Sequence, residues 1–252
     1  YKNIVKSKFC SKIENEHGIS VYTLEHLLAT LSSLYIDNLI IEINSPELPA
    51  MDGSANEYIS RILKIGKKVQ NHARKYLKIK KELSVFVDKR WIKVSPSNHL
   101  NLDLEINYPD TIIGKDKLSY SHNEKNFVNN ICYARTFALA SNIEKLKASG
   151  FGIGGNLNNA IVVDKNKIIN QSGLRCKNEF IKHKVLDCIG DLYLSGYQIL
   201  GDFQSFAPGH ELNQKILLEI FNSETNYECV HLNDFNTSYL SNQIDIRNYS
   251  IA

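Results

Sequence analysis

Residues 178–196 combine a helical pattern of apolar residues with ionisable side chains at intervals of four, and the predicted helix ends at a glycine. The ionisable residues are Glu179, His183, Asp187 and Asp191. Residues four apart lie on the same face of a helix, so His183 and Asp187 point the same way. An imidazole and a carboxylate at this spacing can share one zinc ion, and Glu179 and Asp191 can orient the ligands. The alternative is a solvated helix face with a hydrogen bond between the two side chains.

The first part of the chain alternates helix and strand patterns. Apolar residues at helical spacing predict a helix over 19–36, for which Thr23 can supply the N-terminal cap. The run LIIEI at 39–43 indicates a strand, and the Pro and Asp-Gly of the following ELPAMDGS are typical of a turn. A second helix is predicted from about Ala55 to Leu63. The polar and basic residues 64–75 are the best candidate for a domain boundary.

Strand patterns dominate after that boundary. The pieces YLKIKKEL, LSVFV, WIKVS and LNLDLEI within 76–106 alternate apolar and polar residues, which predicts an antiparallel sheet with one wet face. A helical pattern returns over 124–148, IVVD at 161–164 indicates a short strand, and GHELNQKILLEIF indicates one more helix. The order predicts an α+β fold in which helices pack on sheets. The last thirty residues are polar, so we expect them to be partly loose.

Composition excludes several classes of function. Of 252 residues, 43% are hydrophobic and 23% are charged, which is the balance of a globular protein. The net charge of +3 is too small to indicate a nucleic-acid partner or a membrane surface. No stretch approaches the roughly 18 apolar residues that span a bilayer. The five cysteines are far apart and form no C-x-x-C pair, which disfavours a disulfide framework. We therefore expect a cytoplasmic protein.

A Glu–His pair, Glu25 and His26, lies inside an otherwise apolar helical pattern. A glutamate beside a histidine ligand can act as a general base in hydrolytic zinc sites. The alternative is a core histidine with a satisfied hydrogen bond, since the full H-E-x-x-H pattern is absent.

His210 follows a glycine at a predicted junction between a loop and a helix. A histidine in this place can reach into a cleft and give a proton to a leaving amine. The alternative is a surface histidine that caps the helix.

The segment 150–155 matches G-x-G-x-x-G literally. A dinucleotide-binding turn needs a strand before it and a helix after it. Here a helical pattern precedes and a strand pattern follows, so the sequence predicts a flexible loop instead.

Taken together, these segments resemble one family, the UDP-3-O-acyl-N-acetylglucosamine deacetylases of lipid A synthesis. The resemblance covers residues 23 to about 220, with the blocks in the same order and at similar spacings. The matching blocks are TLEHLLATL, ELPAMDGSA, ARTF, GGNLNNAIVVD, EFIKHKVLDCIGDLYLSG and GHELNQKILL.

The resemblance implies two α/β sandwich domains that each layer helices on a sheet, with the active site between them. We expect the first domain at 1–75, N-terminally truncated, and the second at 76–252 with an insert near 138–169. The family's Zn²⁺ ligands correspond to His26, His183 and Asp187. Its catalytic residues correspond to Glu25 as general base, His210 with Asp191 supporting it, Thr136 facing the carbonyl oxygen, and Lys184. Phe137, together with Thr136 and Lys184, is implied in substrate binding.

The implied function is zinc-dependent hydrolysis of the N-acetyl group of UDP-3-O-acyl-N-acetylglucosamine by a monomeric enzyme. One departure from the family is Phe206-Ala207-Pro208-Gly209, which lacks the basic residue usually found before the S-G-H turn. The alternative is a catalytically impaired family member that binds the sugar nucleotide or a partner protein.

Overall fold

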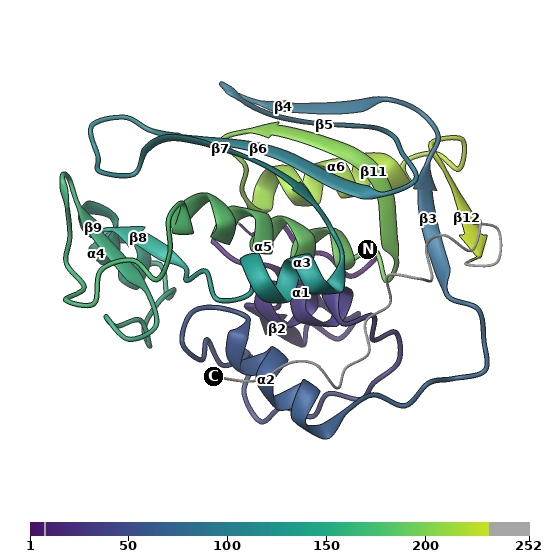
Figure 1. The fold of residues 1–252 in the computed structure, drawn as a ribbon, viewed down its shortest axis with the longest axis horizontal. Coiled ribbons are helices and arrows are strands. Elements are labelled where there is room, and N and C mark those ends of the chain that lie inside the picture. Colours follow the sequence, from purple (N-terminus) through teal and green to yellow (C-terminus); the bar gives the residue numbers. More distant parts are fainter. Residues whose placement is uncertain (8, 232–252) are drawn as a thin grey trace.

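Helix α5 (Glu179–Tyr193) runs through the middle of the computed structural model, which describes residues 1–7 and 9–231 (Figure 1). It confirms the helix predicted over 178–196, and it lies between the large sheet and helix α1 (Glu25–Ser33). Every residue from Val185 to Leu192 is buried. The face that carries the ionisable residues is therefore inside the protein, which excludes the interpretation as a solvated face.

A short hairpin precedes α1 and shortens the helix that the sequence predicts. It consists of β1 (Lys12–Glu14) and β2 (Ser20–Tyr22). Residues 20–22 pair with β1 rather than extending the helix, so the predicted start is wrong. Thr23 does not cap the helix either. Its φ of 60° lies in the left-handed region, and its hydroxyl donates to Glu47 at 2.9 Å.

The strand predicted at 39–43 is absent from the structure, where these residues form irregular chain. Ile40 is 91% exposed, and none of the described strands pairs with this segment. A strand needs a partner for its backbone groups, and apolar alternation alone does not supply one. The turn at Asp52-Gly53 and the helix after it, α2 (Asn56–Ile65), are as predicted.

A seven-stranded mixed sheet covers one side of α5. Its strands are β12 (Tyr227–His231), β3 (Lys75–Ile79), β11 (Gln198–Phe206), β5 (Arg90–Pro96), β4 (Leu83–Val87), β6 (Leu100–Tyr108) and β7 (Gly114–Ser121). The four strand patterns of 76–106 are confirmed as β3, β4, β5 and β6. The sheet is not purely antiparallel, however, because β11 runs parallel to both β3 and β6.

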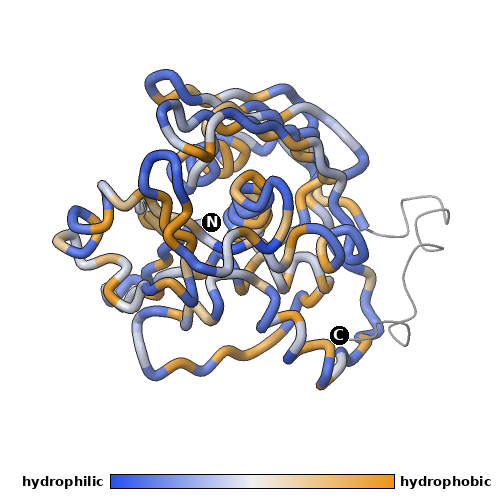
Figure 2. The backbone as a smooth tube through the Cα atoms, turned by 60° about the vertical axis from the view of Figure 1, so that its left-hand side comes forward, coloured by the Kyte–Doolittle hydropathy of each residue, from blue (hydrophilic) through white to orange (hydrophobic). Residues whose placement is uncertain are grey.

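Alternation along β6 explains how the sheet builds the core. Leu100, Leu102, Leu104 and Ile106 are buried, whereas the residues between them face outward. On the outer face, Lys117 pairs with Asp103 across the strands at 2.9 Å. Figure 2 shows hydrophilic and hydrophobic segments alternating along the strands at the top of the molecule. The inner face packs on α5 and on α6 (His210–Phe221), the helix predicted from GHELNQKILLEIF.

The region over 124–168 forms α3 and a smaller unit at one end of the molecule (Figure 1). Its elements are α3 (Glu124–Asn130), β8 (Phe137–Leu139), α4 (Ala140–Ala148), β9 (Ile161–Asp164) and β10 (Lys167–Ile168). The helical pattern over 124–148 is thus interrupted by β8, while IVVD is a strand as predicted. The glycine-rich segment 150–155 is a loop between α4 and β9, as expected from its reversed context.

The observed elements confirm the predicted α+β class. Of the last thirty residues, those at 227–231 form β12, and 232–252 lie outside the described residues. All five cysteines are free thiols. The described residues include no helix with the length and apolar character that a membrane crossing requires.

Two phenylalanines on this sheet provide a matched test of the core. Phe203 on β11 is 1% exposed, whereas Phe86 on the edge strand β4 is 64% exposed. Phe203→Ala should lower the free energy of unfolding by about 3–5 kcal/mol because it leaves a cavity. Phe86→Ala should change it by less than about 0.5 kcal/mol. Urea unfolding of both variants checks this, and equal losses would contradict the assigned layers.

Candidate metal centre

Helices α1 and α5 meet at Gly190, and this contact positions the site. A Cβ atom at Gly190 would lie 2.0 Å from the carbonyl oxygen of Glu25, so only glycine allows the two backbones to approach this closely. The first turn of α1 therefore lies directly on α5. This places His26 of α1 against the inward face of α5 that carries His183 and Asp187.

The ring nitrogens of the two histidines converge on one oxygen of Asp187. His183 Nε2 lies 3.2 Å and His26 Nε2 3.8 Å from Oδ1 of Asp187. One potential ligand atom of each residue lies within 4.8 Å of the others. The imidazole rings meet edge to face with their centroids 5.1 Å apart. All three residues are buried. The structure thus brings together the three residues whose roles the family resemblance implies.

The protonation of these groups suits a bound cation. His183 Nδ1 lies 3.0 Å from the carbonyl oxygen of Ala134. Because a carbonyl only accepts, Nδ1 carries the proton and leaves the Nε2 lone pair of a neutral ring free. Burial, with His183 nearby, lowers the pKa of His26 to about 3. Burial likewise lowers the pKa of His183. Both rings are therefore neutral at physiological pH, as metal ligands must be.

The two carboxylate oxygens of Asp187 have different neighbours: one binds the ammonium group of a lysine, and the other faces the imidazoles. Oδ2 accepts a hydrogen bond from Lys184 Nζ at 2.9 Å. Oδ1 is buried and has no hydrogen-bond partner within the described chain. Although burial favours the neutral acid, the neighbouring His183 ring and the Lys184 ammonium hold the pKa of Asp187 well below its ordinary value. An unpartnered buried carboxylate oxygen is costly, and here it faces two imidazole nitrogens. Such a donor set fits Zn²⁺.

A second pair of groups, His210 and Glu25, lies beside the metal ligands. His210 Nδ1 donates to Asp191 Oδ2 at 2.9 Å, and its Nε2 lies 3.9 Å from Glu25 Oε1. Burial disfavours the charged ring, but Asp191 and then Glu25 outweigh it and raise the pKa of His210 to about 10. Burial, supported by Asp191 and Asp187, raises the pKa of Glu25 to about 7. His210 can therefore donate a proton, and Glu25 can accept one near neutrality.

The ARTF segment forms one border of the site. The ring of Phe137 lies 6.4 Å from the ring of His183 and 5.2 Å from Lys184 Nζ. The backbone N–H of Thr136 donates to the carbonyl of Gly53 at 2.8 Å, which ties this segment to the Asp-Gly turn. Thr136 and Phe137 thus belong to the same segment as Ala134, whose carbonyl accepts the hydrogen bond from His183.

Glu179, which the helix stripe indicated as a residue that can orient the ligands, does not contact them directly. It is fully buried and accepts hydrogen bonds from the backbone and the guanidinium of Arg135, at 3.1 and 2.9 Å. Glu179 lies one turn before His183, at the start of α5, where Arg135 can reach it. It therefore holds Arg135, the residue that follows Ala134, whose carbonyl binds His183.

Sequence reasoning missed Ser11 and Asn213, which both bind Asp191. The Ser11 hydroxyl donates to Asp191 Oδ1, and Asn213 Nδ2 donates to Oδ2 at 2.8 Å. Asn213 follows His210 by three residues on α6, so helical spacing could have indicated it. Ser11 precedes β1 in irregular chain, and no local pattern marks it.

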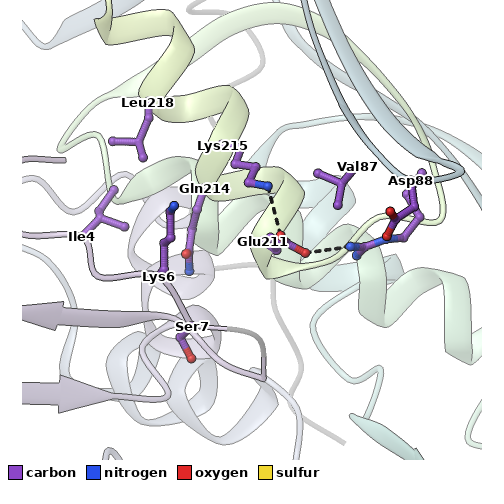
Figure 3. Close-up of a pocket in the computed structure, with 10 residues that line it drawn as sticks. Ile4, Lys6, Ser7, Val87, Asp88, Glu211, Gln214, Lys215 and Leu218 are labelled. Carbon is purple, nitrogen blue, oxygen red and sulfur yellow. Dashed lines mark hydrogen bonds and ion pairs between the residues drawn. The ribbon is translucent and has the colours of Figure 1, made fainter.

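A pocket of about 410 Å³ lies beside α6 and contains none of the metal ligands (Figure 3). Glu211 in its wall pairs with Arg90 at 2.7 Å and with Lys215 at 3.0 Å. Glu211, Arg90 and Lys215 thus satisfy one another. The pocket adjoins the site through α6, where Glu211 follows His210, and its wall also includes Ser7 of the segment that precedes Ser11.

Comparison with known proteins places this geometry in context. Residues 1–222 match the family model described as "LpxC: UDP-3-O-acyl N-acetylglycosamine deacetylase". Curated relatives carry the name UDP-3-O-acyl-N-acetylglucosamine deacetylase. The chain is 42% identical to that of Pasteurella multocida (strain Pm70) and 43% identical to that of Haemophilus influenzae (strain PittEE), each over 227 residues. Each alignment covers 89% of this chain and 74% of the relative. The Actinobacillus pleuropneumoniae serotype 3 (strain JL03) protein is 40% identical over 236 residues, covering 92% of this chain and 77% of the relative.

The contact at Gly190 yields a test of how the site is assembled. Gly190→Ala should lower the free energy of unfolding by about 1–3 kcal/mol, because the added methyl group forces α1 away from α5. Gly154→Ala is the control, since a Cβ there meets open space and the backbone is not left-handed. Urea unfolding of metal-free protein measures both. Equal stability of the two variants would contradict the close contact.

Proposed function

Because the chain belongs to the UDP-3-O-acyl N-acetylglycosamine deacetylase family, we propose that it hydrolyses the N-acetyl group of UDP-3-O-acyl-N-acetylglucosamine in lipid A synthesis. Water forms a bond to the amide carbonyl carbon, the carbon–nitrogen bond breaks, and acetate and a free amine result. The observation that carries the proposal is the convergence of three potential metal ligands beside a Glu–His pair. Hydrolysis of an amide requires an acid and a base at such a centre.

We propose that His26, His183 and Asp187 hold Zn²⁺. When bound, Zn²⁺ supplies a Lewis acid that polarises a carbonyl and lowers the pKa of water. The fit rests on the neutral imidazoles and on the unpartnered Oδ1 of Asp187. Lys184 keeps Asp187 charged and binds its Oδ2, so that Oδ2 does not face the imidazoles.

Glu25 acts as the general base and His210 as the general acid. Glu25 takes a proton from the attacking water, which its pKa near neutrality permits. His210 gives its proton to the nitrogen of the leaving amine. Asp191 holds the His210 ring through Nδ1, which leaves Nε2 on the side of Glu25. The base and the acid thus act on opposite ends of the bond that breaks.

Three further residues bind the substrate. The Thr136 hydroxyl faces the acetyl carbonyl oxygen in this proposal, and Lys184 contributes positive charge to the oxyanion. Phe137 borders the passage for the acyl chain, which continues along the insert near 138–169. The apolar passage supplies binding energy remote from the amide, which helps to position the reacting group.

We further propose that the chain works as a monomer in the cytoplasm, with a division into two domains at residues 75 and 76. Free thiols at all five cysteines are compatible with a reducing compartment. Residues 66–74 between the two parts contain neither helix nor strand. The two parts contribute different groups, since Glu25 and His26 precede the division, whereas His183, Asp187 and His210 follow it.

Replacing Glu25 tests the assignment of the base. Glu25→Gln should lower kcat by about 10²–10⁴-fold, because the amide cannot take up the proton. Its zinc content should stay unchanged, since Glu25 is not a ligand. Glu16→Gln is the control, because the side chain of Glu16 is 87% exposed. Turnover and metal analysis of purified protein measure both quantities. Full activity in Glu25→Gln would exclude Glu25 as the base. A wild-type protein that retains zinc but shows no turnover would favour an impaired family member.

Replacing Asp191 tests the role of His210 through the pH profile. Asp191 raises the pKa of His210, so Asp191→Asn should lower that pKa. If protonated His210 is the acid, kcat should then fall at lower pH than in the wild type, and the alkaline limb should move toward neutrality. Asp164→Asn, at the exposed end of β9, should leave the limb in place. An unchanged or more alkaline limb in Asp191→Asn would contradict this role.

A further inference from the structure

Ser11 contacts carboxylates on two different helices. Its backbone N–H donates to Glu25 Oε2 at 2.9 Å, and its hydroxyl donates to Asp191 Oδ1. Ser11 is fully buried, as is Asp191. Glu25 belongs to α1 and Asp191 to α5. One small residue therefore joins the proposed base to the carboxylate that holds the proposed acid.

We infer that Ser11 is a positioning residue that fixes the arrangement of Glu25 and His210 around the reacting amide. The inference rests on the proposed function. Because Ser11 occupies Oε2 of Glu25, the other oxygen, Oε1, faces His210 Nε2 at 3.9 Å. The same residue fixes the carboxylate of Asp191, to which His210 donates through Nδ1.

The backbone of Ser11 is itself held in place on both sides. Its carbonyl accepts a hydrogen bond from the backbone N–H of Thr23 at 3.0 Å. The next residue, Lys12, begins β1 and pairs with Tyr22 of β2. Figure 3 shows the preceding segment, with Ile4, Lys6 and Ser7, lying near α6. Ser11 is thus anchored to the hairpin that leads directly into α1.

The hydroxyl and the backbone of Ser11 have separable roles. The backbone bond to Glu25 persists in any substitution other than proline, whereas only the hydroxyl reaches Asp191. On Oδ2 of Asp191, His210 and Asn213 donate at 2.9 and 2.8 Å. On Oδ1, the Ser11 hydroxyl is joined among residues 1–7 and 9–231 by the longer His210 contact of 3.2 Å alone. Removing the hydroxyl leaves a buried carboxylate oxygen poorly satisfied, and the carboxylate can rotate and carry His210 with it.

A pair of variants of equal shape isolates the hydroxyl. Ser11→Thr keeps it, and Ser11→Val matches threonine in shape but lacks it. We expect Ser11→Val to lower kcat by about 10- to 100-fold relative to Ser11→Thr, with KM within about threefold. Ser11→Val should unfold at a somewhat lower urea concentration than Ser11→Thr, because a methyl group replaces the hydroxyl and leaves the buried Asp191 oxygen poorly satisfied, but both variants should be folded in the assay. Equal kcat in the two variants would overturn the inference, as would a loss of kcat that the unfolded fraction of Ser11→Val accounts for.

A spectroscopic readout separates this inference from the proposed function. In protein labelled with ¹⁵N-histidine, with and without added zinc, the His210 ring signals of Ser11→Val should shift relative to those of Ser11→Thr. Indistinguishable ring signals would overturn the link between Ser11 and His210. If the wild type shows no turnover while the ring signals still differ, the proposed function fails and the positioning role stands. Should both bulky variants fail to fold, Ser11→Ala against wild type applies the same two measurements without added bulk.

Discussion

The close contact of α1 with α5 at Gly190 is the constraint on which the site depends. With a side chain at Gly190, the carbonyl of Glu25 could not lie on α5, since a Cβ would come within 2.0 Å of it. Without that approach His26 would not reach Asp187. The sheet and α6 contribute by burying α5, so that its charged residues meet protein groups rather than water. The absence of a Cβ at Gly190 therefore allows α1 and α5, which are distant in the sequence, to share a site.

Burial gives the two histidine sets opposite charge states. Around Asp187, burial keeps His26 and His183 neutral, and Lys184 supplies the compensating cation. Around Asp191, the carboxylate keeps His210 charged in spite of burial. Asp187 and Asp191 are one helical turn apart, so one face of α5 divides the site into a half that suits a metal and a half that suits proton transfer. The two halves differ because Asp187 contacts the ammonium of Lys184, whereas Asp191 contacts the charged ring of His210.

The spacing of residues along single helices was predictable from the sequence, whereas contacts between elements were not. His183 and Asp187 follow from i,i+4 geometry on one strong helix. The meeting of His26 with them came from the family resemblance, because no local pattern relates α1 to α5. The segment 39–43 has strand composition but no partner strand, and β11 was missed because a central strand buried on both faces lacks clear alternation. Gly190 and Ser11 were missed because their roles exist only in the tertiary contacts.

X-ray absorption at the zinc edge of purified, metal-replete protein tests the central claim most directly. The account predicts about one zinc per chain, with two imidazole nitrogens and a carboxylate oxygen as the protein ligands. In His183→Ala, tight zinc binding should be lost, or one imidazole should disappear from the remaining spectrum. A zinc content far below one per chain, sulfur among the ligands, or an unchanged spectrum in His183→Ala would contradict the account.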